Sequence, residues 1–246
     1  MRALSPAELL SVWERGMGLP PAHRAMLLLA ASLPEIPPET LAEFSVGWRD
    51  GRLLDLRQAT FGPRLVSVAS CPECGERLEL NFNVADIQSS SNGEQVDPFE
   101  LKLNGYEARF RLLNSRDLMA MAGGPAQESF ATARQFLASR CLIAVSHDGE
   151  EIGAERLPGD LLEAMSTRMA EADPQADVQL KISCAKCRRQ WRMIFDIVSY
   201  FWSEVHAWAE RLLREVHLLA RAYGWREADI IAMSPQRRRL YLEMIT

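Results

Sequence analysis

No stretch of this sequence is long and apolar enough to cross a membrane. The longest tight apolar run, residues 25–32, falls well short of the roughly 20 residues that a membrane span needs. The first ten residues, "MRALSPAELL", contain no long apolar segment, so we expect no secretory signal and a reducing, cytoplasmic environment. The formal net charge is −5, which disfavours nucleic acid and anionic membrane surfaces as partners.

The chain also lacks the short motifs that usually mark an active site. It contains no HExxH, GxSxG, P-loop or GxGxxG pattern. His206 and His217 are spaced to share one face of a helix, but about 16 Å apart, which is too far for them to bind one metal ion. We therefore expect neither an enzyme nor a small-molecule substrate.

What the chain does have is a change of pattern from helix to strand and back to helix. Hydrophobic residues make up 48% of the 246 residues, enough for a real core. We predict an α+β fold in which helical N- and C-terminal parts surround β-hairpins joined by a Cys₄ zinc-ribbon-like site. The regions we expect are a helical one over residues 1–60, a zinc-knuckle β region over 61–198 with a helical insertion at about 114–172, and a helical one over 199–246.

Local signals place several of these elements. Ser5 followed by Glu8 predicts a capping box at the start of the first helix. Gly47 and Gly51 predict a break in the helical stretch over residues 37–62. Asn104-Gly105 between two alternating runs predicts a two-residue hairpin turn.

Two further helices follow from apolar periodicity. A helix is expected over residues 127–145, with Phe130 and Ile143 among its apolar positions. A longer helix begins near Phe201, because apolar residues recur every three or four positions at 201, 205, 208, 212, 216, 219 and 223. Gly224 suits the C-cap of this helix, and Ser234 with Pro235 suits the start of the last one.

Two segments repeat the same half of a possible metal site. "SCPECGERLELNF" begins at Ser70 and "SCAKCRRQWRMIF" at Ser183, and each follows an alternating run. Each Cys-x-x-Cys turn supplies two ligands, whereas a structural zinc ion takes four in a tetrahedral arrangement. We predict one structural zinc per chain, held by all four cysteines of the two segments: Cys71, Cys74, Cys184 and Cys187. A site with four protein ligands has no open position for catalysis.

Two other interpretations of these cysteines stay open at this level: ordinary core thiols, and a redox Cys-x-x-Cys, which normally opens a helix. The second turn is also unusual. Arg188 occupies the position of Gly75, where a left-handed backbone is expected, and a non-glycine residue adopts that conformation at a cost of roughly 1 kcal/mol. Cys141, the fifth cysteine, is predicted to be a buried structural thiol.

The C-terminal helices carry aromatic and basic residues beyond what one buried face requires. Such residues usually belong to a core or to a solvated face, yet a helix of this length can also offer a second face to a partner. The predicted partner-binding residues come from the long helix and the two segments after it: Trp202, Trp208, Tyr223, Trp225, Arg237, Arg238 and Tyr241.

Three stretches together resemble a known family. They are "ATFGPRLVSVASCPECGERLEL", "AEADPQADVQLKISCAKCRRQW" and the C-terminal "REVHLLARAYGWREADIIAMSPQRRRLYLEMIT". In these stretches the chain resembles the baseplate hub assembly chaperones of T-even-type tailed phages and their relatives in phage-like contractile injection systems. The Tyr-Gly-Trp sequence followed by Ser-Pro before an Arg-rich last helix is the most specific part of the resemblance.

The resemblance implies a non-enzymatic role. Such a protein helps to assemble a tail baseplate by binding hub or tape-measure proteins, or stays in the baseplate as a structural component. It acts in the cytoplasm of the bacterial host or within a phage-like particle. The alternative that we keep is a zinc-ribbon regulator that binds nucleic acid, which the acidic chain disfavours.

Overall fold

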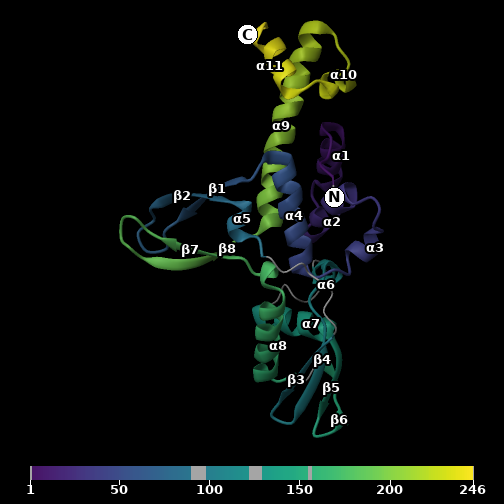
Figure 1. The fold of residues 1–246 in the computed structure, drawn as a ribbon, viewed down its shortest axis with the longest axis vertical. Helices are drawn as coiled ribbons and strands as arrows, with labels where there is room; N and C mark the ends of the chain where they lie inside the picture. The colour runs from purple at the N-terminus through teal and green to yellow at the C-terminus, as the bar shows by residue number, and fades with distance from the viewer. Residues whose placement is uncertain (1, 90–97, 122–128, 155–156, 246) are drawn as a thin grey trace.

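The computed structural model describes residues 2–89, 98–121, 129–154 and 157–245 and mixes helices with small antiparallel sheets, as predicted. Figure 1 shows a helical body, C-terminal helices at one end, a small unit of helices and strands at the other, and two hairpins that project sideways. The helices are α1 (Pro6–Gly16), α2 (Pro21–Ser32), α3 (Pro38–Leu41), α4 (Val46–Phe61), α5 (Val84–Ile87), α6 (Ser115–Met121), α7 (Phe130–Cys141), α8 (Gly159–Ala172), α9 (Ile197–Tyr223), α10 (Glu227–Ala232) and α11 (Pro235–Glu243), with a 3-10 turn at Pro174–Ala176. The strands are β1 (Arg64–Ser70), β2 (Arg77–Asn83), β3 (Phe99–Leu103), β4 (Tyr106–Phe110), β5 (Leu142–His147), β6 (Glu150–Glu151), β7 (Gln179–Ser183) and β8 (Gln190–Ile194).

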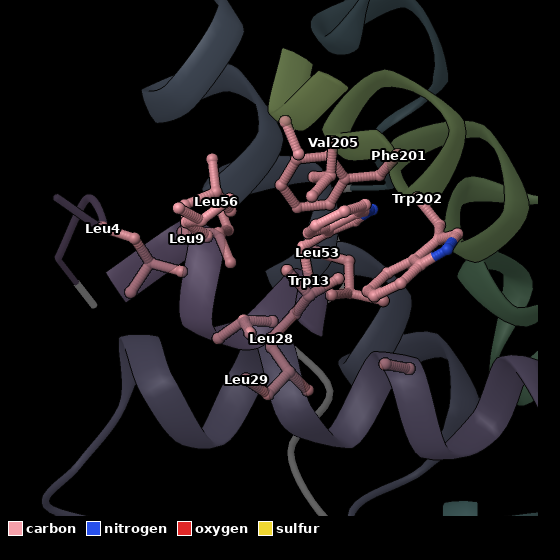
Figure 2. Close-up of a cluster of buried hydrophobic side chains, with 14 of the residues drawn as sticks. Leu4, Leu9, Trp13, Leu28, Leu29, Leu53, Leu56, Phe201, Trp202 and Val205 are labelled. Atoms are coloured by element: carbon pink, nitrogen blue, oxygen red, sulfur yellow. The ribbon is translucent and has the colours of Figure 1, made fainter. Parts of the chain in front are cut away.

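The N-terminal and C-terminal helices form one hydrophobic core. Phe201 and Val205 of α9 are fully buried against Leu53 and Leu56 of α4 and the indole of Trp13 in α1 (Figure 2). Each such side chain stabilises the fold by about 1.5–3 kcal/mol when fully buried. The two ends of the chain are therefore held together by apolar burial, although more than a hundred residues separate them in sequence. Among the described residues, no helix is both long enough and apolar enough to cross a membrane.

The predicted apolar stripe of α9 is present. Phe201, Val205, Leu212, Val216 and Leu219 are buried, whereas position 208 is half-buried and position 223 is exposed. The helix has 27 residues and ends as predicted, with Gly224 in the left-handed region at φ +69°. A helix of this length spans about 40 Å.

The other predicted caps are also confirmed. Ser5 and Glu8 form the capping box of α1, with the Ser5 N–H donating to Glu8 Oε2 at 2.9 Å. The Ser234 hydroxyl accepts a hydrogen bond from the Arg237 N–H at 3.2 Å and caps α11. The starts of α1 and α11 thus follow local side-chain chemistry that the sequence displays.

The predicted break at Gly47 and Gly51 is wrong, because α4 runs through both residues without interruption. The helical stretch is interrupted earlier, between α3 and α4, and Ser45 caps the start of α4. Gly47 lacks a side chain for a tertiary reason: its N–H donates to Asp173 Oδ2 at 2.8 Å, and a Cβ atom would lie 1.8 Å from Asp173 Oδ1. The glycine thus admits a carboxylate from a distant segment.

The predicted helix over residues 127–145 is also partly wrong. It ends at Cys141, and residues 142–147 form β5, which pairs with β4 in the register Ala108↔Val145. Phe130 and Ile143, two of the apolar residues on which the helix was predicted, are 86% and 50% exposed. β-branched residues favour a strand here because a neighbouring strand is available, and the sequence does not show that neighbour. Residues 127–128, the predicted start, lie outside the described residues.

The segment from β3 to α8 has a core of its own. Its sheet has the order β3-β4-β5-β6, and α8 buries Leu161 and Met165 against Phe99 and Phe110. The predicted turn at Asn104-Gly105 is confirmed, since both residues have positive φ, at +50° and +81°. The division of the chain at residues 60 and 198 stays a prediction.

A buried carboxylate fixes the helices of this segment to its sheet. Asp117 of α6 is fully buried and accepts two hydrogen bonds from the Arg111 guanidinium at 2.7 and 3.0 Å. It also accepts from Arg140 Nε at 3.0 Å and from the Asn114 N–H at 3.1 Å. Because both arginines lie on other elements, one side chain joins α6, α7 and the end of β4.

Candidate metal centre

The two hairpins of the repeated segments have the same construction. β1 pairs with β2 and β7 with β8, each as an isolated antiparallel pair, and each turn between them carries two cysteines. The Gly75 N–H donates to the Cys71 carbonyl at 3.0 Å, and the Arg188 N–H donates to the Cys184 carbonyl at 2.9 Å. The two turns therefore share one backbone hydrogen bond at corresponding positions. We call the two hairpins together the arm, which extends away from the helical body in Figure 1.

The arm brings all four predicted ligands together. The Sγ atoms of Cys71, Cys74, Cys184 and Cys187 all lie within 4.8 Å of one another. Cys71 Sγ is 3.6 Å from Cys187 Sγ, and Cys74 Sγ is 3.6 Å from Cys184 Sγ. Four thiolates at about 2.3 Å from a tetrahedral zinc ion are about 3.8 Å apart, so these separations fit the ion.

The contacts between the hairpins obey a twofold relation. A shift of 113 residues (184 − 71) carries Cys71 onto Cys184 and Cys74 onto Cys187, so the two 3.6 Å contacts map onto each other. The same shift carries Phe82 onto Phe195, and these two rings meet edge to face with centroids 5.5 Å apart. The cysteine cluster at the tip and the aromatic pair nearer the body thus lie on one local axis.

Backbone donors around the sulfur atoms favour the thiolate form. The Glu76 N–H donates to Cys74 and the Arg189 N–H to Cys187, in positions related by the same shift. The Cys187 N–H is the main reason that the pKa of the Cys184 thiol is lowered to about 7. Burial and hydrogen bonds with the neighbouring cysteines outweigh these donors at Cys74 and Cys187 and raise the pKa of both thiols, that of Cys187 to about 12. Of these three thiols, only that of Cys184 has a lowered pKa.

The arrangement bears on the two other interpretations of the cysteines. Neither Cys-x-x-Cys opens a helix, as a redox pair does, because both lie in turns between strands. Ordinary core thiols do not require four sulfur atoms to converge from two hairpins. Four protein ligands would give a closed coordination shell, which serves structure rather than catalysis.

Arg188 adopts the conformation that its position demands. Its φ is +61°, close to the +71° of Gly75, so the second turn has the same shape as the first at the cost of a left-handed arginine. We predict that Arg188→Gly raises the free energy of unfolding by roughly 0.5–1 kcal/mol and that Gly75→Ala lowers it by a similar amount. Thermal unfolding of the two variants measures both changes. A Cβ at Gly75 meets nothing within 4 Å, so backbone strain is the only expected cause.

A hydroxyl group anchors the base of the arm to the long helix. The Tyr200 hydroxyl donates to the Val66 carbonyl at 3.1 Å and accepts from the Val66 N–H at 3.0 Å. The ring of Tyr200 also packs on Phe195, with centroids 5.3 Å apart. The edge of β1 is thereby joined to the first turn of α9.

Cys141 lies apart from the cluster. It is fully buried at the end of α7, as predicted, and burial raises the pKa of its thiol to about 12. Such a thiol is neither a good nucleophile nor a good metal ligand.

The predicted partner-binding residues fall into two groups. Trp202 and Arg238 are buried, at 7% and 3% exposure: the Trp202 indole packs where Gly16 leaves room, and Arg238 pairs with Glu215 at 2.7 Å. The sequence prediction placed both at a surface, whereas the structure places both in the interior. Trp208 is half-buried against the main core.

The remaining four residues meet at the C-terminal end of α9. Tyr223 stacks on Trp225 with centroids 4.4 Å apart, and Tyr241 packs edge-on against both rings. The Arg237 guanidinium lies over the Tyr241 ring at 5.6 Å. We call Tyr223, Trp225, Arg237 and Tyr241 the C-terminal tip.

Comparison with known proteins identifies one family. The sequence model of a family described as T4 bacteriophage base plate protein matches residues 31–202, which is more than half of the chain and includes all four clustered cysteines. Neither the curated proteins nor the solved structures give a match.

Proposed function

Because the chain belongs to the family of T4 bacteriophage base plate proteins, we propose that it is a non-enzymatic assembly chaperone or structural component of a contractile-type tail baseplate. The family supports a structural or assembly role in a baseplate, and the match over residues 31–202 is the observation that carries the proposal. Its partners would be hub or tape-measure proteins, met in the cytoplasm of the bacterial host.

Zinc is the second part of the proposal. Four thiols that converge at the separations of a tetrahedral site support one structural zinc per chain, bound by Cys71, Cys74, Cys184 and Cys187. When bound, the ion would supply a cross-link between the two hairpins. The arm would then present a fixed shape to its partners.

The C-terminal tip is the partner surface that we favour among the residues predicted from sequence. Tyr223 is 37% exposed, Leu240 of α11 is 52% exposed, and Met244, the C-cap of α11, is 71% exposed. Aromatic residues and arginine are the side chains that most often dominate protein interfaces.

Co-expression with the tail proteins encoded by neighbouring genes tests this role. We expect a stable complex on size-exclusion chromatography with a hub or tape-measure protein. The double variant Tyr223→Ala, Arg237→Glu should weaken that complex at least about tenfold, because it removes one aromatic anchor and reverses one charge. Phe130→Ala is the matched control, since it removes an aromatic side chain that is 86% exposed elsewhere on the chain.

Failure to form a complex with any of these tail proteins would contradict the assembly role. If a complex forms, mass spectrometry of purified particles distinguishes the two proposed roles, assembly chaperone and structural component. A structural component is present in the finished particle, whereas a chaperone is required for assembly and absent from the product.

A further inference from the structure

The second hairpin carries positive charge that nothing in its own sequence balances. Residues 178–195 contain five cations and no aspartate or glutamate, in a chain whose net charge is −5. All five are exposed: Lys181, Lys186, Arg188, Arg189 and Arg192. The signal is visible in the sequence, but only the hairpin structure gathers these residues on one small element.

Most of these cations have no acidic partner within the described part of the chain. Lys186 pairs with Glu76 at 3.2 Å, whereas the structure forms no ion pair of that kind for the other four among the residues it describes. Lys181 and Arg192 stand directly opposite each other on β7 and β8. Like charges at opposed positions destabilise an antiparallel pair, so the hairpin keeps this arrangement at a cost to its own stability.

The first hairpin shows that the shape of the arm does not require these cations. Under the 113-residue shift, Lys186, Arg189 and Arg192 fall on glutamates 73, 76 and 79. The two hairpins have the same turns and the same strand pairing, yet they carry opposite charges at these three positions. A hairpin of this shape therefore does not require positive charge at these three positions in order to fold.

The same hairpin offers main-chain and apolar contacts beside the charges. β7 and β8 form a two-stranded sheet, so in the described chain neither outer edge is paired with a further strand. A depression of about 480 Å³ along it is lined by Lys181, Ile182, Ser183, Gln190, Trp191 and Arg192. An open strand edge beside a depression of mixed polar and apolar lining suits an extended peptide, which can pair its backbone along a strand.

We propose that Lys181, Arg188, Arg189 and Arg192 dock an acidic extended segment of another protein. We call this surface the basic hairpin face. Strand edges favour a peptide over a nucleic acid, because only a peptide can continue the backbone ladder. The inference rests on the proposed function only in taking a protein as the partner, and it concerns a surface other than the C-terminal tip.

A defined peptide tests the proposal without knowledge of the natural partner. The probe is a fluorescein-labelled peptide of alternating glutamate and valine, about twelve residues long, which exceeds the length of β7 and its turn at about 3.3 Å per residue. Fluorescence anisotropy with the full, zinc-loaded chain should show saturable binding with a micromolar Kd. That Kd should weaken at least about tenfold between roughly 50 and 200 mM salt, because exposed charges are screened over that range.

Charge reversal locates the binding surface. The triple variant Lys181→Glu, Arg189→Glu, Arg192→Glu should lose at least about tenfold in affinity. The triple variant keeps a like-charge pair at positions 181 and 192, so we expect the stability of the hairpin to change little. Arg188 is left unchanged because its left-handed backbone conformation shapes the turn that carries Cys184 and Cys187. The control Arg221→Glu, Arg226→Glu, Arg239→Glu makes the same change in net charge on exposed residues elsewhere and should keep affinity within about twofold.

Three results would overturn the proposal. The first is that the glutamate peptide shows no saturable binding at low salt. The second is that the triple variant and its control lose equal affinity for the peptide. The third is that an oligothymidine of similar length binds more tightly than the peptide, which would make this face a nucleic-acid surface. The assay uses only the purified chain. Its outcome is therefore independent of whether any tail protein forms a complex.

Discussion

Replacing Cys184 with serine is expected to abolish the proposed zinc binding and to lower the free energy of unfolding by at least about 4 kcal/mol. Cys184 is buried, and its Sγ lies 3.6 Å from that of Cys74, so its loss removes one of four converging ligands. Three remaining thiolates would repel one another without a full coordination shell around the ion. Among the described residues, the Phe82–Phe195 contact and the Glu76–Lys186 pair would still join the two hairpins.

Metal analysis and thermal unfolding measure this effect. Wild-type protein should contain one zinc per chain, and the variant should contain almost none, with a melting temperature lower by roughly 10 °C. Cys141→Ala is the matched control, because it removes the one cysteine outside the cluster and should leave the zinc content unchanged. Freshly purified wild-type protein without zinc would refute the proposed clamp.

The second large effect is expected from Asp117→Ala, which should lower the free energy of unfolding by about 3 kcal/mol. The substitution leaves the guanidinium groups of Arg111 and Arg140 without their shared counter-charge and the buried Asn114 N–H without its acceptor. The two arginines are 37% and 36% exposed, so water compensates part of the loss. The cost therefore stays below that of a fully buried broken pair.

Hydrogen exchange is the suitable measurement for Asp117→Ala. All six tryptophans lie outside residues 99–172, so intrinsic tryptophan fluorescence would not report on this segment. Faster exchange should be confined to β3–β5 and α6–α8. Glu107→Ala is the control, since it breaks an exposed ion pair with Lys102 in the same sheet and should change stability by at most about 1 kcal/mol. Equal effects of the two changes would show that the buried cluster adds little.

The sequence was sufficient wherever the determining chemistry is local or repeated. The capping box at Ser5, the turn at Asn104-Gly105 and the stripe of α9 each depend on residues a few positions apart. The convergence of the four cysteines was also predictable, because the same spacing and the same alternation occur twice. Family membership followed from the longer stretches around these cysteines.

The features that the sequence did not predict share a different cause, which is contact between separate segments of the chain. Gly47 is a glycine because Asp173 approaches it, residues 142–147 are a strand because β4 lies beside them, and Trp202 is buried because Gly16 leaves a space. The buried cluster around Asp117 likewise depends on arginines six and 23 positions away. Propensity and periodicity cannot specify such neighbours.

The single helix α9 sets the distance between two parts of the molecule. It starts next to the base of the arm, where Tyr200 holds Val66, and its last residue is Tyr223 of the C-terminal tip. Proteins bound at these two places would be held apart by a distance that the number of residues in one uninterrupted helix determines. Inserting four residues into this helix would lengthen that spacing by about 6 Å and rotate one end by about 40° relative to the other.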